Sequence, residues 1–275
     1  MKIINSYKSI QHYFDRKEFN RSVWKEYAAD ISAELPDKCI KDAKTYDYEG
    51  EILPIIQAVL SHPQKMELIS ESFDAVTRDL TLHLARLFDS EPDVRIILYL
   101  GLCNGAGWAT KLENRDAILL GIEKIAELNW CEKESMQALI FHEVGHIWHK
   151  YIRGTKSDDY PINSSILQLY QEGIAMICEQ ILCNDSNYYH QNKNSWLHWC
   201  RENEENLKQE YYKRVSERAD TQVFFGDWCS YQGHSDVGYY LGCQFIRFLQ
   251  KKYSLIEAAA LPNFVLEDEF RQFAV

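Results

Sequence analysis

An apolar run over residues 136–148 is interrupted by two histidines and a glutamate, and this interruption constrains the fold more than any other feature of the sequence. The three residues are His142, Glu143 and His146, in the pattern H-E-x-x-H. A mostly uncharged stretch of this length predicts a buried helix. Buried polar side chains are costly unless they form hydrogen bonds or bind a metal. We therefore expect a buried helix whose polar residues have dedicated partners.

The spacing of the motif is typical of a helix that holds a metal ion. Histidines four residues apart lie about one turn from each other on the same helical face, so both imidazoles can reach one ion. Glu143 projects roughly 100° around the helix, where it would meet a water on the metal rather than the metal itself. This layout is typical of a zinc hydrolase. The alternative is a helix whose histidines form hydrogen bonds within the core.

A catalytic zinc usually takes three protein ligands. If His142 and His146 are two of them, another residue must supply the third. His149 shares the face of His142, but about 10 Å of helical rise separates them, too far for both to bind one ion. Glu172 is the better candidate, because it is a charge within the mostly apolar segment 165–178. The alternative is a partly exposed helix charge. Glu179 lies on the same face as Glu172, but too far along the axis to share the ion.

Four stretches of the sequence together resemble a known family. H-E-V-G-H at 142–146, followed by Q-E-G-I-A at 171–175, resembles the gluzincin zinc peptidases. The resemblance is closer to the uncharacterised bacterial group called predicted Zn-dependent proteases. F-F-G-D at 224–227 and G-Y-Y-L-G at 238–242 are similar to the C-terminal signature of that group. The likeness covers the chain from Val94 to Lys252.

The resemblance implies a ligand set and a catalytic role for particular residues. His142, His146 and Glu172 would bind one Zn²⁺ per chain, and Glu143 would be the general base. Tyr239 would stabilise the transition state. The chain departs from the family at Met176, where an acidic residue often follows the glutamate ligand by one turn. The carboxylate that usually orients a zinc histidine must then come from elsewhere.

The oxyanion that forms during hydrolysis needs a hydrogen-bond donor besides the metal. Tyr240 and His234 are further candidates for this role. Tyr239, Tyr240 and His234 are equally compatible with ordinary aromatic packing or with a solvated loop.

The pattern of apolar residues predicts an α+β fold that is mainly helical, with a small antiparallel or mixed sheet before the H-E-x-x-H helix. The resemblance to the gluzincins implies that this part forms a zincin-like catalytic core. We expect a helical N-terminal subdomain over residues 1–92 and a metallopeptidase domain over 93–275. Expected strands span 94–100, 108–110 and 116–122, and expected helices include 19–35, 70–88, 199–218 and 237–252.

Gly105, Ala106 and Gly107 precede the second expected strand. Their small side chains would leave room for an extended substrate backbone to pair with the edge of the sheet. The alternative is a simple hairpin with no role in binding.

Composition limits the partners and the compartment. The net charge is −11 with no long basic run, so nucleic acid and anionic membranes are not expected as partners. The chain lacks an apolar stretch long enough to span a bilayer and an apolar core of signal-peptide length near residue 1. Its eight cysteines show no C-x-x-C spacing. These features predict a cytoplasmic protein with reduced thiols.

The sequence therefore favours zinc-dependent hydrolysis of peptide bonds in a peptide or protein substrate. One alternative is a catalytically weak relative that keeps the zinc site as a structural or regulatory element. Another is a helical interaction protein in which the motif is accidental. The sequence does not decide between endopeptidase and aminopeptidase action, and it does not indicate an oligomeric state.

Overall fold

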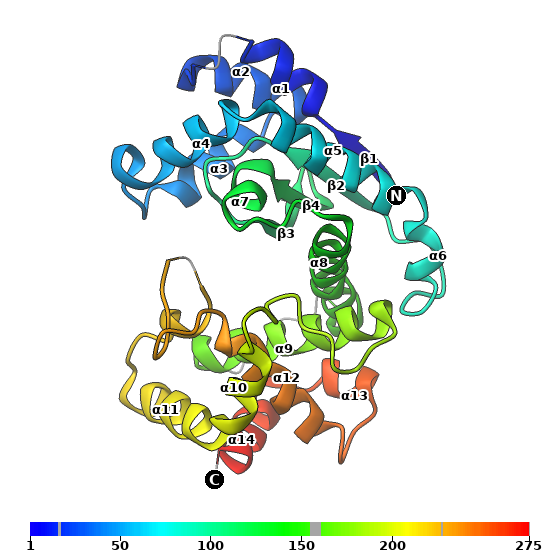
Figure 1. The fold of residues 1–275 in the computed structure, drawn as a ribbon. Coiled ribbons are helices and arrows are strands. Elements are labelled where there is room, and N and C mark those ends of the chain that lie inside the picture. The colour runs from blue at the N-terminus through cyan, green and yellow to red at the C-terminus, as the bar shows by residue number, and fades with distance from the viewer. Residues whose placement is uncertain (16–17, 155–160, 227, 275) are drawn as a thin grey trace. The chain divides into compact units, whose positions relative to one another are not determined.

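The computed structural model describes residues 1–15, 18–154, 161–226 and 228–274. The fold is α+β, as the sequence predicts: mainly helical, with a four-stranded mixed sheet that precedes the long helices α8 (Lys133–Arg153) and α9 (Ser164–Cys183) (Figure 1). The chain divides into two compact units, unit 1 (residues 1–143) and unit 2 (residues 144–275). The division falls inside α8. Residue 93, where the sequence predicts the second domain to begin, lies just before the strand β2 (Val94–Tyr99). The predicted domain division stays a prediction.

The sheet belongs to unit 1 and has the strand order β1-β2-β4-β3. Its strands are β1 (Lys2–Asn5), β2 (Val94–Tyr99), β3 (Gly107–Leu112) and β4 (Arg115–Gly121). β1 and β4 run parallel to β2, whereas β3 pairs antiparallel with β4. The three predicted strands are confirmed. β2 is buried along its whole length, which explains its β-branched composition.

The hairpin between β3 and β4 has a tight turn at Glu113 and Asn114. Both residues have positive φ, 52° and 62°, the geometry of the two-residue turns that match the twist of paired strands. This turn leaves β3 as the edge strand on one side of the sheet.

Short helices surround the sheet in unit 1. They are α1 (Tyr7–Tyr13), α2 (Arg21–Ile31), α3 (Leu35–Ala43), η1 (Tyr48–Ile52), α4 (Leu53–Leu60), α5 (Pro63–Arg78), α6 (Leu80–Leu84) and α7 (Ile122–Glu127). α1 packs against β2 and α5 against β1.

Two predicted helices of unit 1 have different bounds in the structure. The helix expected over 19–35 is two helices, α2 and α3, and Pro36 lies in the first turn of α3 instead of ending a helix. Proline is tolerated there because the first-turn N–H groups have no partner within the helix. The helix expected over 70–88 begins earlier, at Pro63, and breaks at Asp79.

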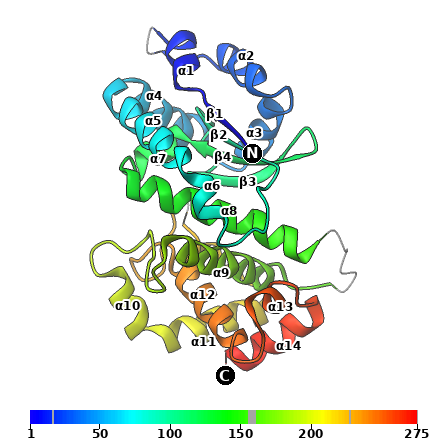
Figure 2. The ribbon, with the colours of Figure 1, turned by 90° about the vertical axis from the view of Figure 1, so that its right-hand side faces the viewer.

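Unit 2 is helical. After α9 come α10 (Trp196–Glu202), α11 (Glu204–Glu217), η2 (Gln222–Phe224), α12 (Val237–Leu249), α13 (Leu255–Ala259) and α14 (Asn263–Phe273). The predicted helix over 199–218 is divided at Asn203, whereas α12 follows the predicted 237–252 closely. α9 packs against α12 along the middle of the unit (Figure 2). Within the described ranges, no helix combines the length and the apolarity that crossing a membrane needs.

Candidate metal centre

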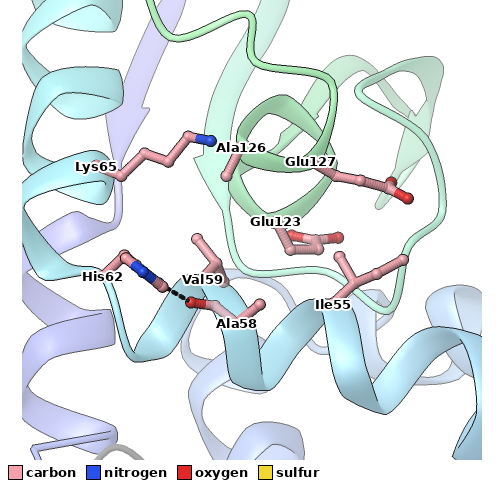
Figure 3. A pocket seen from close by; sticks show the side chains of 8 residues that line it. All are labelled: Ile55, Ala58, Val59, His62, Lys65, Glu123, Ala126 and Glu127. Atoms are coloured by element: carbon pink, nitrogen blue, oxygen red, sulfur yellow. Dashed lines mark hydrogen bonds between the residues drawn. The ribbon is translucent and has the colours of Figure 1, made fainter.

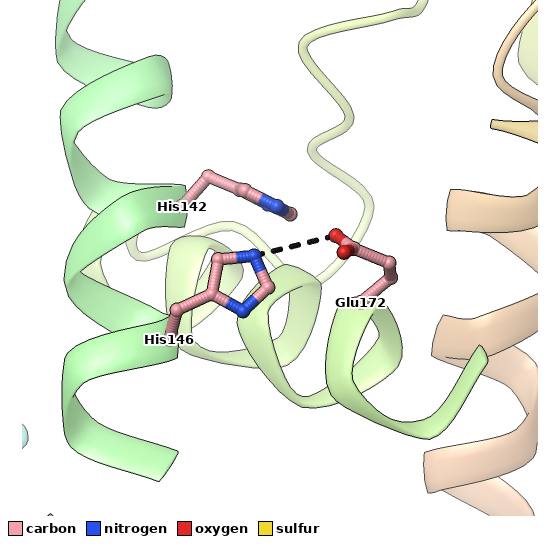
Figure 4. Close-up of side chains that lie close together, drawn as sticks. All are labelled: His142, His146 and Glu172. Carbon is pink, nitrogen blue, oxygen red and sulfur yellow. Dashed lines mark ion pairs between the residues drawn. The ribbon is translucent and has the colours of Figure 1, made fainter. Parts of the chain in front are cut away.

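Two histidines of α8 and one glutamate of α9 converge. His142 and His146 lie on consecutive turns of α8, and Glu172 lies in the middle of α9, with its carboxylate turned toward both rings (Figure 4). One potential ligand atom from each residue lies within 4.8 Å of the others. The predicted set of two histidines and Glu172 is thus a group that can hold a metal ion.

The spacing within this group fits a tetrahedral ion. His146 Nε2 lies 3.3 Å from Glu172 Oε2. Two ligand atoms bonded at zinc distances and at a tetrahedral angle are separated by about 3.4 Å. The side chains of His146 and Glu172 are 22% and 18% exposed, whereas His142 is buried. The group therefore has a solvent-accessible side, as a site that must admit water requires.

Gly145, inside the motif, allows α8 and α9 to approach closely. A Cβ at this position would lie 2.8 Å from Ala175 Cα and 2.9 Å from Cys178 Cβ. Such separations are too short for real carbon atoms. A larger residue at position 145 would push the two helices apart and separate His146 from Glu172.

Glu143 faces the edge strand within unit 1. A Cβ on Gly107 would overlap the carboxylate of Glu143, so the space that Gly107 leaves is filled by this side chain. Gly105 has a φ of +126°, and Ala106 accepts a hydrogen bond from the N–H of Gly121 at 3.0 Å. The glycine-rich segment therefore places the start of β3 beside the expected general base. The substrate role of residues 105–107 stays a prediction.

A second group contains His142 together with Glu179 and His190. Their potential ligand atoms also lie within 4.8 Å of one another. Glu179 is fully buried, and His190 Nδ1 lies 2.9 and 3.1 Å from its two carboxylate oxygens. Sequence reasoning missed His190. The available signal was Glu179 itself, because a charge in an apolar helix needs a partner just as Glu172 does.

The candidate transition-state donors have different surroundings. Tyr239, in the first turn of α12, packs edge-on against His190 with ring centroids 6.1 Å apart. The hydroxyl of Tyr240 donates to Glu204 at 2.6 Å. His234 stacks on Trp199 at 4.0 Å. Tyr239 thus contacts His190, which is a member of the second group. The catalytic roles of Tyr239, Tyr240 and His234 stay predictions.

The two C-terminal stretches that resemble the family pattern lie at α12, and the second of them, residues 238–242, is part of that helix. Phe225 lies against Gly238, where a Cβ would come within 2.6 Å of the ring. Gly242 lies at the crossing with α9, where a Cβ would be 2.6 Å from Leu169 O. Gly173, next to Glu172, faces Gly242 at this crossing. Asp227, the last residue of the first signature stretch, lies outside the described residues.

His149, which helical rise excludes as a ligand, has a packing role. Its ring lies edge-on to Tyr170 with centroids 4.8 Å apart. Burial, the nearby Arg153 and His146 together lower its pKa to about 3. The imidazole is therefore neutral at ordinary pH and belongs to the core of unit 2.

A separate pocket lies in unit 1 between α4, α5 and α7, with a volume of about 270 Å³ (Figure 3). It is lined by Ile55, Ala58, Val59, His62, Lys65, Glu123, Ala126 and Glu127. Glu123 is fully buried and accepts hydrogen bonds from the N–H groups of Gly101 and Cys103 at 2.8 and 3.1 Å. Its carboxylate thus holds the turn that follows β2.

The chain matches no protein-family model, no curated protein and no solved structure. A functional assignment consequently depends on the chemistry of the site.

Proposed function

We propose that the protein is a zinc-dependent peptidase related to the gluzincins, with Zn²⁺ held by His142, His146 and Glu172. The observation that carries the proposal is the convergence of these three side chains, with an inter-ligand distance of 3.3 Å. Two imidazoles and one carboxylate, with an open position, are the ligand set of many hydrolytic zinc enzymes.

Zinc bound at such a site supplies Lewis acidity, which activates water and polarises a carbonyl group. Glu143 is the group that would accept the proton of the attacking water and pass it to the leaving amine. It follows His142 directly on α8, so its side chain projects about 100° around the helix from that ligand. Tyr239 would donate a hydrogen bond to the oxyanion.

The edge strand supports a peptide as the substrate. Glu143 lies against Gly107, at the start of β3, and β3 ends the strand order of the sheet. An extended peptide can add to such an edge through main-chain hydrogen bonds. We therefore propose that a peptide binds along β3, with its scissile bond close to Glu143.

A metal assay combined with a hydrolysis assay tests the proposal. Tag-free protein should contain about one zinc per chain, and His146→Ala should lose it. Glu143→Gln should keep the zinc and the fold but lower peptide hydrolysis by at least about 10²-fold, since general-base catalysis typically contributes that much. Wild type that stays zinc-free after incubation with the ion would refute the proposal.

A catalytically weak protein with a structural or regulatory zinc is the second candidate. The observation that favours it is Met176, a buried apolar residue one turn after Glu172, where the family often has an acid. The same assay separates the two candidates. Equal and negligible hydrolysis by wild type and Glu143→Gln, with zinc bound to both, would favour the second.

A further inference from the structure

Glu179 is a fully buried carboxylate with a dedicated partner. Nδ1 of His190 contacts both of its oxygens, at 2.9 and 3.1 Å, and the His190 side chain is only 7% exposed. Nε2 of His190 lies 2.8 Å from Nε2 of the Gln191 side-chain amide. Burying a carboxylate is strongly unfavourable unless it is paired. A pair that is held this completely indicates a fixed position for the Glu179 carboxylate.

The pair lies close to His142: one potential ligand atom from each of His142, Glu179 and His190 lies within 4.8 Å of the others. Glu172 and Glu179 share one face of α9, about two turns apart, and His142 and His146 share one face of α8. Glu172 is close to His146, and Glu179 is grouped with His142. An imidazole that binds a metal through one ring nitrogen commonly donates its other N–H to a carboxylate, which fixes the ring orientation.

We propose that Glu179, held in place by His190, is the carboxylate that orients His142 for metal binding. Glu179 and His190 are then positioning residues that act through His142. The inference rests on the metal site of the proposed function. Glu179 would supply the outer-shell carboxylate that the methionine at position 176 does not provide.

The group of His142, Glu179 and His190 is less suited to a second metal ion. Its members are buried, with Glu179 fully enclosed, so a water ligand would have little access. The first group keeps two partly exposed ligands. One metal ion bound by His142, His146 and Glu172, with Glu179 and His190 orienting His142, therefore gives both groups a role.

The test compares zinc affinity and metal-free stability in the full chain. Zinc affinity is measured by competition with a chromophoric chelator, and stability by thermal unfolding in excess chelator. Glu179→Gln should weaken zinc binding about 10–100-fold, the usual effect of losing an outer-shell partner. Glu179→Asp, which keeps the charge but shortens the side chain, should weaken it less and provides a second variant if the glutamine variant does not fold.

Glu269→Gln is the matched control. Glu269 is also buried in unit 2 and is paired, with Lys252 at 2.7 Å and with the hydroxyl of Tyr253 at 3.1 Å. This variant should lose stability without any change in zinc affinity. A purely structural role for Glu179 would give the same pattern.

Three results would overturn the inference. Glu179 variants that bind zinc as tightly as wild type would overturn it while leaving the proposed function intact. Two zinc ions per wild-type chain, with one lost in Glu179→Gln, would show that Glu179 is itself a ligand. Wild type that binds no zinc would refute the proposed function and this inference together.

Discussion

Glu123 shows how the cost of burying one carboxylate creates a pH dependence. Burial raises its pKa from 4.5 to about 7, although the N–H groups of Gly101 and Cys103 oppose the shift. The folded state consequently holds this proton more tightly than the unfolded state does. The stabilisation that the Glu123 carboxyl contributes is fully present below pH 4.5 and is lost as the pH rises to about 7.

We expect Glu123→Gln to flatten this part of the stability profile. The shift corresponds to roughly 3 kcal/mol of unfolding free energy between the two pKa values. Urea unfolding at a series of pH values should show wild type losing stability relative to the variant as the pH rises from 4.5 to 7. Glu134→Gln, at an exposed position in the first turn of α8, is the control. Parallel profiles for wild type and Glu123→Gln would contradict the prediction.

At the level of single residues, the sequence identified the members of the candidate metal group but not all of their surroundings. His142, His146 and Glu172 are recognisable because helical spacing and an isolated charge in an apolar helix are local patterns. His190 lies in a polar loop, and its partner Glu179 is eleven residues away. No spacing rule joins a loop residue to a helix face, so this pairing needed the fold.

The crossing of α9 and α12 requires glycine on both helices. A Cβ on Gly242 would lie 2.6 Å from Leu169 O and 2.9 Å from Gly173 N. Backbone atoms cannot move aside as flexible side chains do, so a larger residue must separate the helices. Glu172 precedes Gly173, and the separation would therefore disturb the metal site as well.

Gly242→Ala should destabilise the protein by about 1–3 kcal/mol through overpacking. Helix propensity alone predicts the opposite sign, a gain of about 1 kcal/mol. Urea unfolding decides between them, and the chelator competition assay should show weaker zinc binding. Ser216→Ala, on the exposed face of α11, reports the propensity effect alone. A gain in stability for Gly242→Ala would contradict the close crossing.

Among the elements, the three strands that follow residue 92 were predictable and the N-terminal strand β1 was not. β2 and β4 follow their predicted ranges because both are buried apolar stretches. β1 was missed, since Lys2–Asn5 has only two apolar residues and gains its stability from the parallel pairing with β2. The helix break at Asp79 escaped prediction because apolar residues continue on both sides of it. The break at Asn203 escaped prediction because it lies within a polar stretch rich in glutamate, a residue that favours helices.

Across the whole molecule, most of the eight cysteines are enclosed as thiols. Cys183 and Cys229 are partly exposed, and the remainder are buried: Cys39, Cys103, Cys131, Cys178, Cys200 and Cys243. Burial raises the pKa of Cys39 and of Cys200 to about 12. Because the thiolate is the reactive form, buried thiols of this kind react slowly. Thiol reactivity thus reports on both units at once.

Titration with a thiol reagent should detect two fast-reacting groups in the native protein and eight after denaturation, in line with the exposure of the cysteines. Zinc should leave the native count unchanged, because the proposed ligands are two histidines and one glutamate. Cys183→Ser combined with Cys229→Ser should abolish the fast phase without altering zinc affinity. A zinc-dependent loss of fast thiols would instead place the metal on cysteine. Such a result would contradict zinc binding by His142, His146 and Glu172, because this group contains no cysteine.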